Sequence, residues 1–111
     1  MFGFFRSEPV TTHAAKDVAA RLAEGTIHLV DVREDGEWRS GRIAGARHAP
    51  LSALSRLAPG LPTDKPVVFY CHSGARSAQA VALCRKLGLA HDAHLGGGVI
   101  GWRAAGLPLV R

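Results

Sequence analysis

A strand, a cysteine-led loop and a helix follow one another in this chain, and their order strongly constrains the fold. Residues Val67–Tyr70 form a continuous β-branched and aromatic run, typical of a strand covered on both faces. Pro66 precedes the run, at a position where a strand tolerates proline. From Arg76 onward apolar residues recur at helical spacing, and Gly88 is a helix stop signal. The segment therefore predicts a buried strand, a tight turn and a helix.

Cys71 opens the loop between this strand and this helix. Gly74 supplies the positive φ that a sharp reversal needs. A cysteine that faces successive backbone N–H groups and a helix N-terminus lies in an anion-binding concavity. Such surroundings lower a thiol pKa from roughly 8.5 toward about 3.5–7.5, and Arg76 adds a positive charge. Cys71 is therefore predicted to be a nucleophile, and the alternative is an inert cysteine buried at a strand end.

Strands and helices are predicted to alternate along the rest of the chain. The expected strands are residues 10–11, 27–32 and 91–95, and the expected helices are residues 13–23, 36–41, 51–57 and a segment around Trp102. Thr12 is predicted to cap the first helix. This alternation predicts an α/β domain with a mainly parallel sheet, whose ligand site lies beyond the carboxyl ends of the strands. Cys71 and the turn from Asp31 to Arg33 both follow strand ends.

Length and charge restrict the class of protein. A chain of 111 residues is long enough for one domain. Residues 1–7 are predicted to form an N-terminal arm, and residues 8–111 the domain. The apolar start is too short for a membrane span and lacks the basic residues of a signal peptide, so no membrane contact and a cytoplasmic location are expected. The formal charge of +5 favours anionic partners, but the basic residues are scattered, so we expect a small anion or an acidic protein rather than nucleic acid.

Three other features are interpreted as structural. The glycine-rich run 96–101 fits the dinucleotide fingerprint, but too little chain follows it for a βαβ unit, so a strand-to-helix turn is predicted. His91 and His94 lack a third ligand nearby, so neither a metal nor a cofactor is expected. Cys84 falls in step with the apolar face of the helix after Cys71 and is predicted to be a core residue, with a resolving-cysteine role as the alternative.

Three segments in order carry a resemblance to a known family. They are residues 29–46, which begin Leu-Val-Asp-Val-Arg-Glu and include Glu37 and Trp38; residues 71–77, Cys-His-Ser-Gly-Ala-Arg-Ser; and residues 95–108, which begin Leu-Gly-Gly-Gly and include Trp102. With these segments the chain resembles the rhodanese domain, a single-domain sulfurtransferase, over about residues 8–109. The resemblance implies a three-layer domain with a central, mainly parallel sheet flanked by helices.

The resemblance also implies an activity and a set of site residues. Cys71 would take a sulfane sulfur from thiosulfate or a persulfide, become a persulfide, and pass the sulfur to cyanide or a thiol; a sulfur-relay protein is a further class of partner. Asp31 would support the site, and Glu37 would be an ion-pair partner rather than a base. The residues implied to bind the sulfur or its donor are Arg33 and the loop residues His72, Ser73, Gly74, Ala75, Arg76 and Ser77.

Some positions depart from the family pattern, and two other functions are to be weighed. His72 stands where arginine is usual, Arg42 replaces a histidine, and His48 replaces an asparagine. A neutral His72 would bind thiosulfate less well, so a persulfide donor is the alternative. Cysteine-and-arginine phosphatases and arsenate reductases have a loop one residue longer than the one between Cys71 and Arg76. A non-catalytic rhodanese-like binding module commonly lacks the cysteine that this chain retains.

Overall fold

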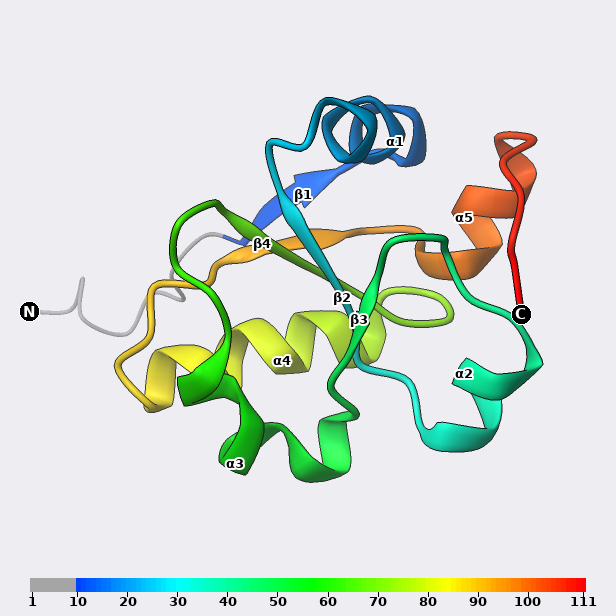
Figure 1. Ribbon diagram of the computed structural model, residues 1–111. Coiled ribbons are helices and arrows are strands. Elements are labelled where there is room, and N and C mark those ends of the chain that lie inside the picture. The colour runs from blue at the N-terminus through cyan, green and yellow to red at the C-terminus, as the bar shows by residue number, and fades with distance from the viewer. Residues whose placement is uncertain (1–9) are drawn as a thin grey trace, which may run out of the picture.

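The computed structural model describes residues 10–111; the predicted arm over residues 1–7 and the domain start at residue 8 lie outside the described residues. Strands and helices alternate through this part of the chain (Figure 1). The strands are β1 Thr11–His13, β2 His28–Asp31, β3 Arg47–His48, β4 Val67–Tyr70 and β5 Ala93–Leu95. The helices are α1 Ala15–Glu24, α2 Asp35–Ser40, α3 Leu54–Leu57, α4 Ala75–Lys86 and α5 Gly98–Ala104, with short 3-10 turns η2 Leu51–Ala53 and η3 Ala58–Gly60.

The strands of the described residues form one parallel sheet in the order β1-β5-β4-β2-β3. β4 has the predicted bounds and lies at the centre, with every residue buried. Asp31 of β2 pairs with Tyr70 of β4, so these two strands end level with each other. The turns that follow β2 and β4 therefore open at the same edge of the sheet, the edge at which the sequence places the site.

Helices cover both faces of the sheet and give the predicted three-layer α/β fold, with α1 above the sheet and α3 and α4 below it in Figure 1. Tyr70 joins the core on the α1 and α5 side, where Val18 and Trp102 pack. Phe69 points to the opposite face, as strand alternation requires, and packs in the core that includes Cys84 of α4. Cys84 is fully buried, which confirms its predicted place in the core.

Two predictions about the outer strands are wrong, and the strand β3 is missing from the predictions. Thr12 does not cap a helix: it lies in β1 beside His94, and α1 begins at Ala15 without a side-chain cap. The parallel ladder with β5 keeps Thr12 extended, and a helix starting there would lose these bonds. β5 begins at Ala93 rather than at residue 91. β3 was not predicted, because two residues are too short to carry a hydrophobic period; they form a strand only by pairing with β2.

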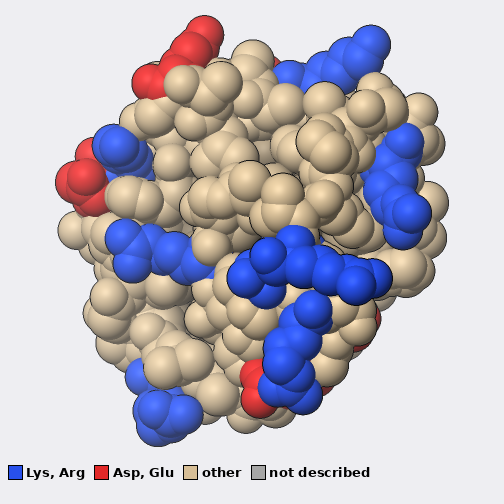
Figure 2. Space-filling view, turned by 45° about the vertical axis from the view of Figure 1, so that its right-hand side comes forward, with Lys and Arg blue, Asp and Glu red and all other residues tan. Residues whose placement is uncertain are grey.

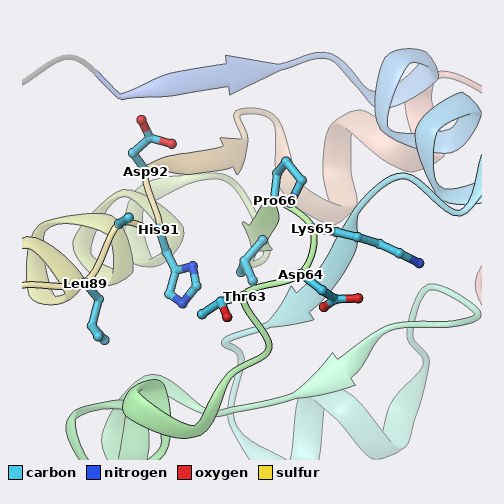
Figure 3. Close-up of a pocket in the computed structure, with 9 residues that line it drawn as sticks. Thr63, Asp64, Lys65, Pro66, Leu89, His91 and Asp92 are labelled. Atoms are coloured by element: carbon cyan, nitrogen blue, oxygen red, sulfur yellow. The ribbon is translucent and has the colours of Figure 1, made fainter.

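A cavity of about 420 Å³ lies at the end of the sheet opposite Cys71 (Figure 3). Its walls come from the chain before β4 and from the segment between α4 and β5, which includes His91. His91 packs edge-on against Phe69.

No helix within residues 10–111 has the length and apolar character needed to cross a membrane. These residues also hold no cluster of three or more histidine, cysteine or acidic side chains placed for a metal ion.

Candidate active site

The sulfur of Cys71 faces the backbone of the loop that leads from β4 into α4. The N–H of Gly74 donates to Sγ over 3.1 Å, and the N–H of Ser77 donates over 3.4 Å. The Ser77 hydroxyl oxygen lies 3.7 Å from the same sulfur. Gly74 has φ +118, so the loop reverses at the predicted glycine. The sulfur thus lies among hydrogen-bond donors at the N-terminus of the 12-residue helix α4.

These donors lower the pKa of the thiol. Burial acts to raise the pKa of Cys71, which is 1% exposed. Hydrogen bonds from the N–H and hydroxyl of Ser77 and from the N–H groups of Gly74 and Ser73 outweigh burial, and the pKa of Cys71 is below its usual value. Cys84 is buried too, and there burial raises the thiol pKa. Within residues 10–111 the two thiol pKa values therefore shift in opposite directions, because the loop donors face the sulfur of Cys71 and burial alone acts on Cys84.

The start of α5 holds the loop in this shape. The N–H of Val99 donates to the carbonyl of Cys71 over 2.9 Å, and the N–H of Ile100 donates to the carbonyl of His72 over 3.1 Å. Figure 1 shows the loop after β4 beside the first turn of α5. Because these carbonyls turn toward α5, the N–H groups that follow them in the loop are free to face the sulfur.

Two glycines allow this close approach. Gly98 has φ +57, and a Cβ there would lie 2.5 Å from the carbonyl carbon of His72. A Cβ on Gly74 would overlap the carbonyl oxygen of Gly96. The glycine-rich run 96–101 is therefore the strand-to-helix turn that the sequence predicts, and its function is to fit the backbone against the Cys71 loop.

Arg76 and Glu37 form an ion pair beside the loop. Nη1 and Nη2 of Arg76 donate to the two carboxylate oxygens of Glu37 over 2.7 and 2.8 Å. The hydrogen bonds from Arg76 lower the pKa of Glu37 to about 2. Glu37 is thus an ion-pair partner, as expected. The role of Arg76 in binding a donor stays a prediction, and in this structure Glu37 holds its guanidinium.

A buried ion pair lies behind the turn after β2. Asp31 is fully buried and Arg33 is 5% exposed. Nε of Arg33 donates to both carboxylate oxygens over 3.1 Å, and Nη2 donates to one of them over 2.8 Å. Nη2 also donates to the carbonyl of Gly41, and the guanidinium lies 5.7 Å from the centre of the Tyr70 ring. The pair connects the turn after β2 with Gly41 and with Tyr70 at the end of β4, and its role in the site stays a prediction.

A depression of about 370 Å³ opens beside the loop. It brings together Arg33, Glu37 and the exposed His72 with Arg103 of α5. Ser73 and Ala75 are exposed, while Gly74 and Ser77, whose N–H groups donate to the Cys71 sulfur, are buried. Figure 2 turns the α5 side of the molecule forward and shows several basic side chains and few acidic ones across this face.

Comparisons with known proteins agree with this fold and show the family. A family model described as the rhodanese-like domain matches residues 14–105. The chain belongs to the rhodanese-like domain family. It is 37% identical over 97 residues to a sulfurtransferase of Allochromatium vinosum, with 86% of this chain and 91% of the relative covered. It is 29% identical over 90 residues to the thiosulfate sulfurtransferase GlpE of Pseudomonas aeruginosa, with 81% and 82% covered. The crystal structure of a rhodanese-related protein from Thermoplasma volcanium superposes with a TM-score of 0.80 at 32% identity, over 90% of this chain and 97% of that chain.

The site of this rhodanese-like domain contains one residue that sequence reasoning missed. Nδ1 of His94 lies 2.7 Å from the hydroxyl oxygen of Ser77, which in turn lies beside the Cys71 sulfur. His94 is 8% exposed, and burial lowers its pKa. Its alternation with Ala93 and Leu95 on β5 indicates that His94 faces the opposite side of the sheet from these two residues. The sequence does not show which residue of α4 lies beside it.

Proposed function

We propose that this rhodanese-like domain transfers sulfane sulfur through a persulfide on Cys71. The convergence of the Gly74 and Ser77 N–H groups on the Cys71 sulfur, with the lowered thiol pKa, carries the proposal. A thiolate is the reactive form of cysteine, and these donors favour it despite burial. The same donors suit a persulfide, whose terminal sulfur also carries negative charge.

The proposed reaction has two displacements. In the first, the Cys71 thiolate attacks the outer sulfur of thiosulfate, a new S–S bond forms, and sulfite leaves with the electron pair of the broken bond. In the second, cyanide or a thiolate attacks the terminal sulfur, and the electron pair of the S–S bond returns to Cys71. Both steps exchange one anion for another, so neither needs a cofactor or an outside oxidant.

The charge around the loop favours persulfide donors over thiosulfate. Arg76 is held by Glu37, and Arg33 is held by Asp31, so two of the nearby positive charges are already balanced. The exposed His72 occupies the position where arginine would supply a further fixed charge. A doubly charged thiosulfate would gain less from this site than from one with free arginines. We therefore propose a small persulfide or the persulfide of a sulfur-relay protein as the preferred donor.

The loop geometry weighs against phosphatase or arsenate reductase chemistry. Such enzymes need the loop arginine on the oxygens of a tetrahedral anion, where its fork of donors can bind two at once. Here the guanidinium of Arg76 makes its two-point contact with Glu37 instead. The short loop also places its Gly74 N–H 3.1 Å from the sulfur itself, an arrangement that suits a single sulfur atom.

Steady-state kinetics test the proposal. With thiosulfate or an alkyl persulfide as donor and cyanide as acceptor, we expect parallel double-reciprocal lines, the mark of a covalent intermediate. Cys71→Ser should abolish thiocyanate formation with an unchanged circular dichroism spectrum, and Cys84→Ala is the matched control that keeps activity. Turnover by folded Cys71→Ser, or intersecting lines, would refute the persulfide mechanism. A wild-type protein inactive with both donors would point instead to a binding module.

A further inference from the structure

We propose that His94 is a positioning residue that acts through Ser77 to aim a hydroxyl donor at the Cys71 sulfur. The inference deepens the proposed function, because it rests on Cys71 being the nucleophile. His94 comes from β5 and reaches Ser77 across the α4 face of the sheet. The three side chains lie in one line of contacts: sulfur to hydroxyl 3.7 Å, and hydroxyl to Nδ1 2.7 Å.

The Ser77 hydroxyl has one proton and three neighbours that could accept it. These are the Cys71 sulfur, Nδ1 of His94, and the carbonyl oxygen of Gly74 at 3.1 Å. Ser77 is fully buried, so water does not compete. The direction of the short contact with His94 therefore decides whether the serine proton goes to the ring or is left for the Cys71 sulfur and the Gly74 carbonyl.

The ring of His94 can set that direction. When Nδ1 carries hydrogen, the ring donates to the oxygen of Ser77, and the serine proton is free to point at the thiolate. When Nδ1 is bare, the serine proton turns to the ring, and the sulfur loses one donor. A Cys71 thiol matches the second arrangement, since its S–H then donates to the serine oxygen. The thiolate and the persulfide match the first.

The surroundings of His94 favour action through this hydrogen bond rather than through charge. Burial lowers the pKa of His94, and His13 at the end of β1 lowers it further. His13 is in turn paired with Asp17 of α1 over 3.0 Å. On the α4 side the ring meets the hydroxyl of Ser77, and beyond it lies Cys71. These groups favour a neutral ring, and we assign its hydrogen to Nδ1, the nitrogen that faces Ser77.

The test measures how fast iodoacetamide alkylates Cys71 across a pH series, in a Cys84→Ala background so that one thiol reports. His94→Leu removes the donor to the Ser77 oxygen and leaves the serine proton to the Gly74 carbonyl at 3.1 Å, so the pKa of Cys71 should rise by about one unit and alkylation should slow about tenfold at pH values below the thiol pKa. His94→Asn places an amide near the Nδ1 position, donates without titrating, and should restore the rate to within about threefold. His91→Leu is the matched control, since His91 is equally buried at 8% exposure but packs on Phe69.

Ser77→Ala and the double variant Ser77→Ala/His94→Leu complete a double-mutant cycle. Ser77→Ala should raise the pKa of Cys71 as His94→Leu does, and the double variant should show no further rise, because the effect of His94 passes through Ser77. An unchanged Cys71 pKa in folded His94→Leu, or additive pKa shifts in the double variant, would overturn the inference. If His94→Leu does not fold, slow alkylation of Cys71 in His94→Asn or an unchanged Cys71 pKa in Ser77→Ala would overturn it. Alkylation needs no sulfur donor, so loss of the proposed function and loss of this inference are told apart.

Discussion

Replacing Gly98 by alanine should disorganise the Cys71 loop from outside the loop itself. Gly98 has φ +57, where a non-glycine residue costs roughly 1–2 kcal/mol. Its new Cβ would lie 2.5 Å from the carbonyl carbon and oxygen of His72 and 2.6 Å from the carbonyl oxygen of Cys71. These are backbone atoms, so the start of α5 must move away from the loop.

That movement sets the size of the effect. The hydrogen bonds from Val99 and Ile100 to the loop carbonyls would be lost, at about 0.5–1.5 kcal/mol each. With the backbone strain, the free energy of unfolding should fall by about 2–5 kcal/mol. For a domain of this size the melting temperature should then drop by about 10 °C or more. Sulfur transfer should fall further than stability alone explains, because the N–H groups no longer face the sulfur.

Gly101→Ala is the matched control within the same helix. A Cβ there meets nothing within 4 Å, and alanine in a helix interior is favoured over glycine by about 0.5–1 kcal/mol. Urea unfolding and thiocyanate formation should therefore be unchanged or slightly improved in Gly101→Ala and impaired in Gly98→Ala. Equal stability and activity in the two variants would show that α5 does not hold the loop.

Three further variants test the ion pairs and the second cysteine. The Glu37 pKa is lowered from 4.5 to about 2, so its pair with Arg76 contributes stability above pH 4.5 that is lost as pH falls toward 2. Because both side chains are about a third exposed, Glu37→Gln should remove only about 0.5–1 kcal/mol of this acid dependence in urea titrations, and an unchanged pH curve would contradict the pairing. Asp31→Ala leaves Arg33 buried without its partner and should cost about 3–5 kcal/mol by the same method; a loss below 1 kcal/mol would contradict this. Cys84→Ala should leave the count of rapidly alkylated thiols at one, and a fall to none would show that Cys84 is the reactive cysteine.

The centre of the fold and of the site could be predicted from local signals. Val67–Tyr70 is a short apolar run with proline before it and small residues after it, and the structure places β4 at those bounds. Gly74 is needed for a reversal that begins within three residues of Cys71. Both features depend on neighbours in sequence, so a single sequence was enough to find them.

The parts that failed depend on long-range pairing. Thr12 is extended because β5, some 80 residues later, pairs with it. Glu37 could be predicted as an ion-pair partner, but its contact with Arg76 spans 39 residues. His94 reaches Ser77 of α4 only because β5 pairs with β4 in a register that places His94 beside Phe69. In each case the conformation or the partner of the residue depends on a tertiary contact, and no local sequence pattern predicts that contact.

The central claim, a persulfide on Cys71, is tested most directly by weighing the intact protein. The reduced protein is incubated with thiosulfate, or with an alkyl persulfide, and measured by mass spectrometry before and after cyanide is added. We expect a gain of one sulfur atom that maps to Cys71, is absent in Cys71→Ser, and disappears as thiocyanate forms. A protein that gains no sulfur from either donor, or gains it at Cys84, would rule out a persulfide on Cys71 as the intermediate.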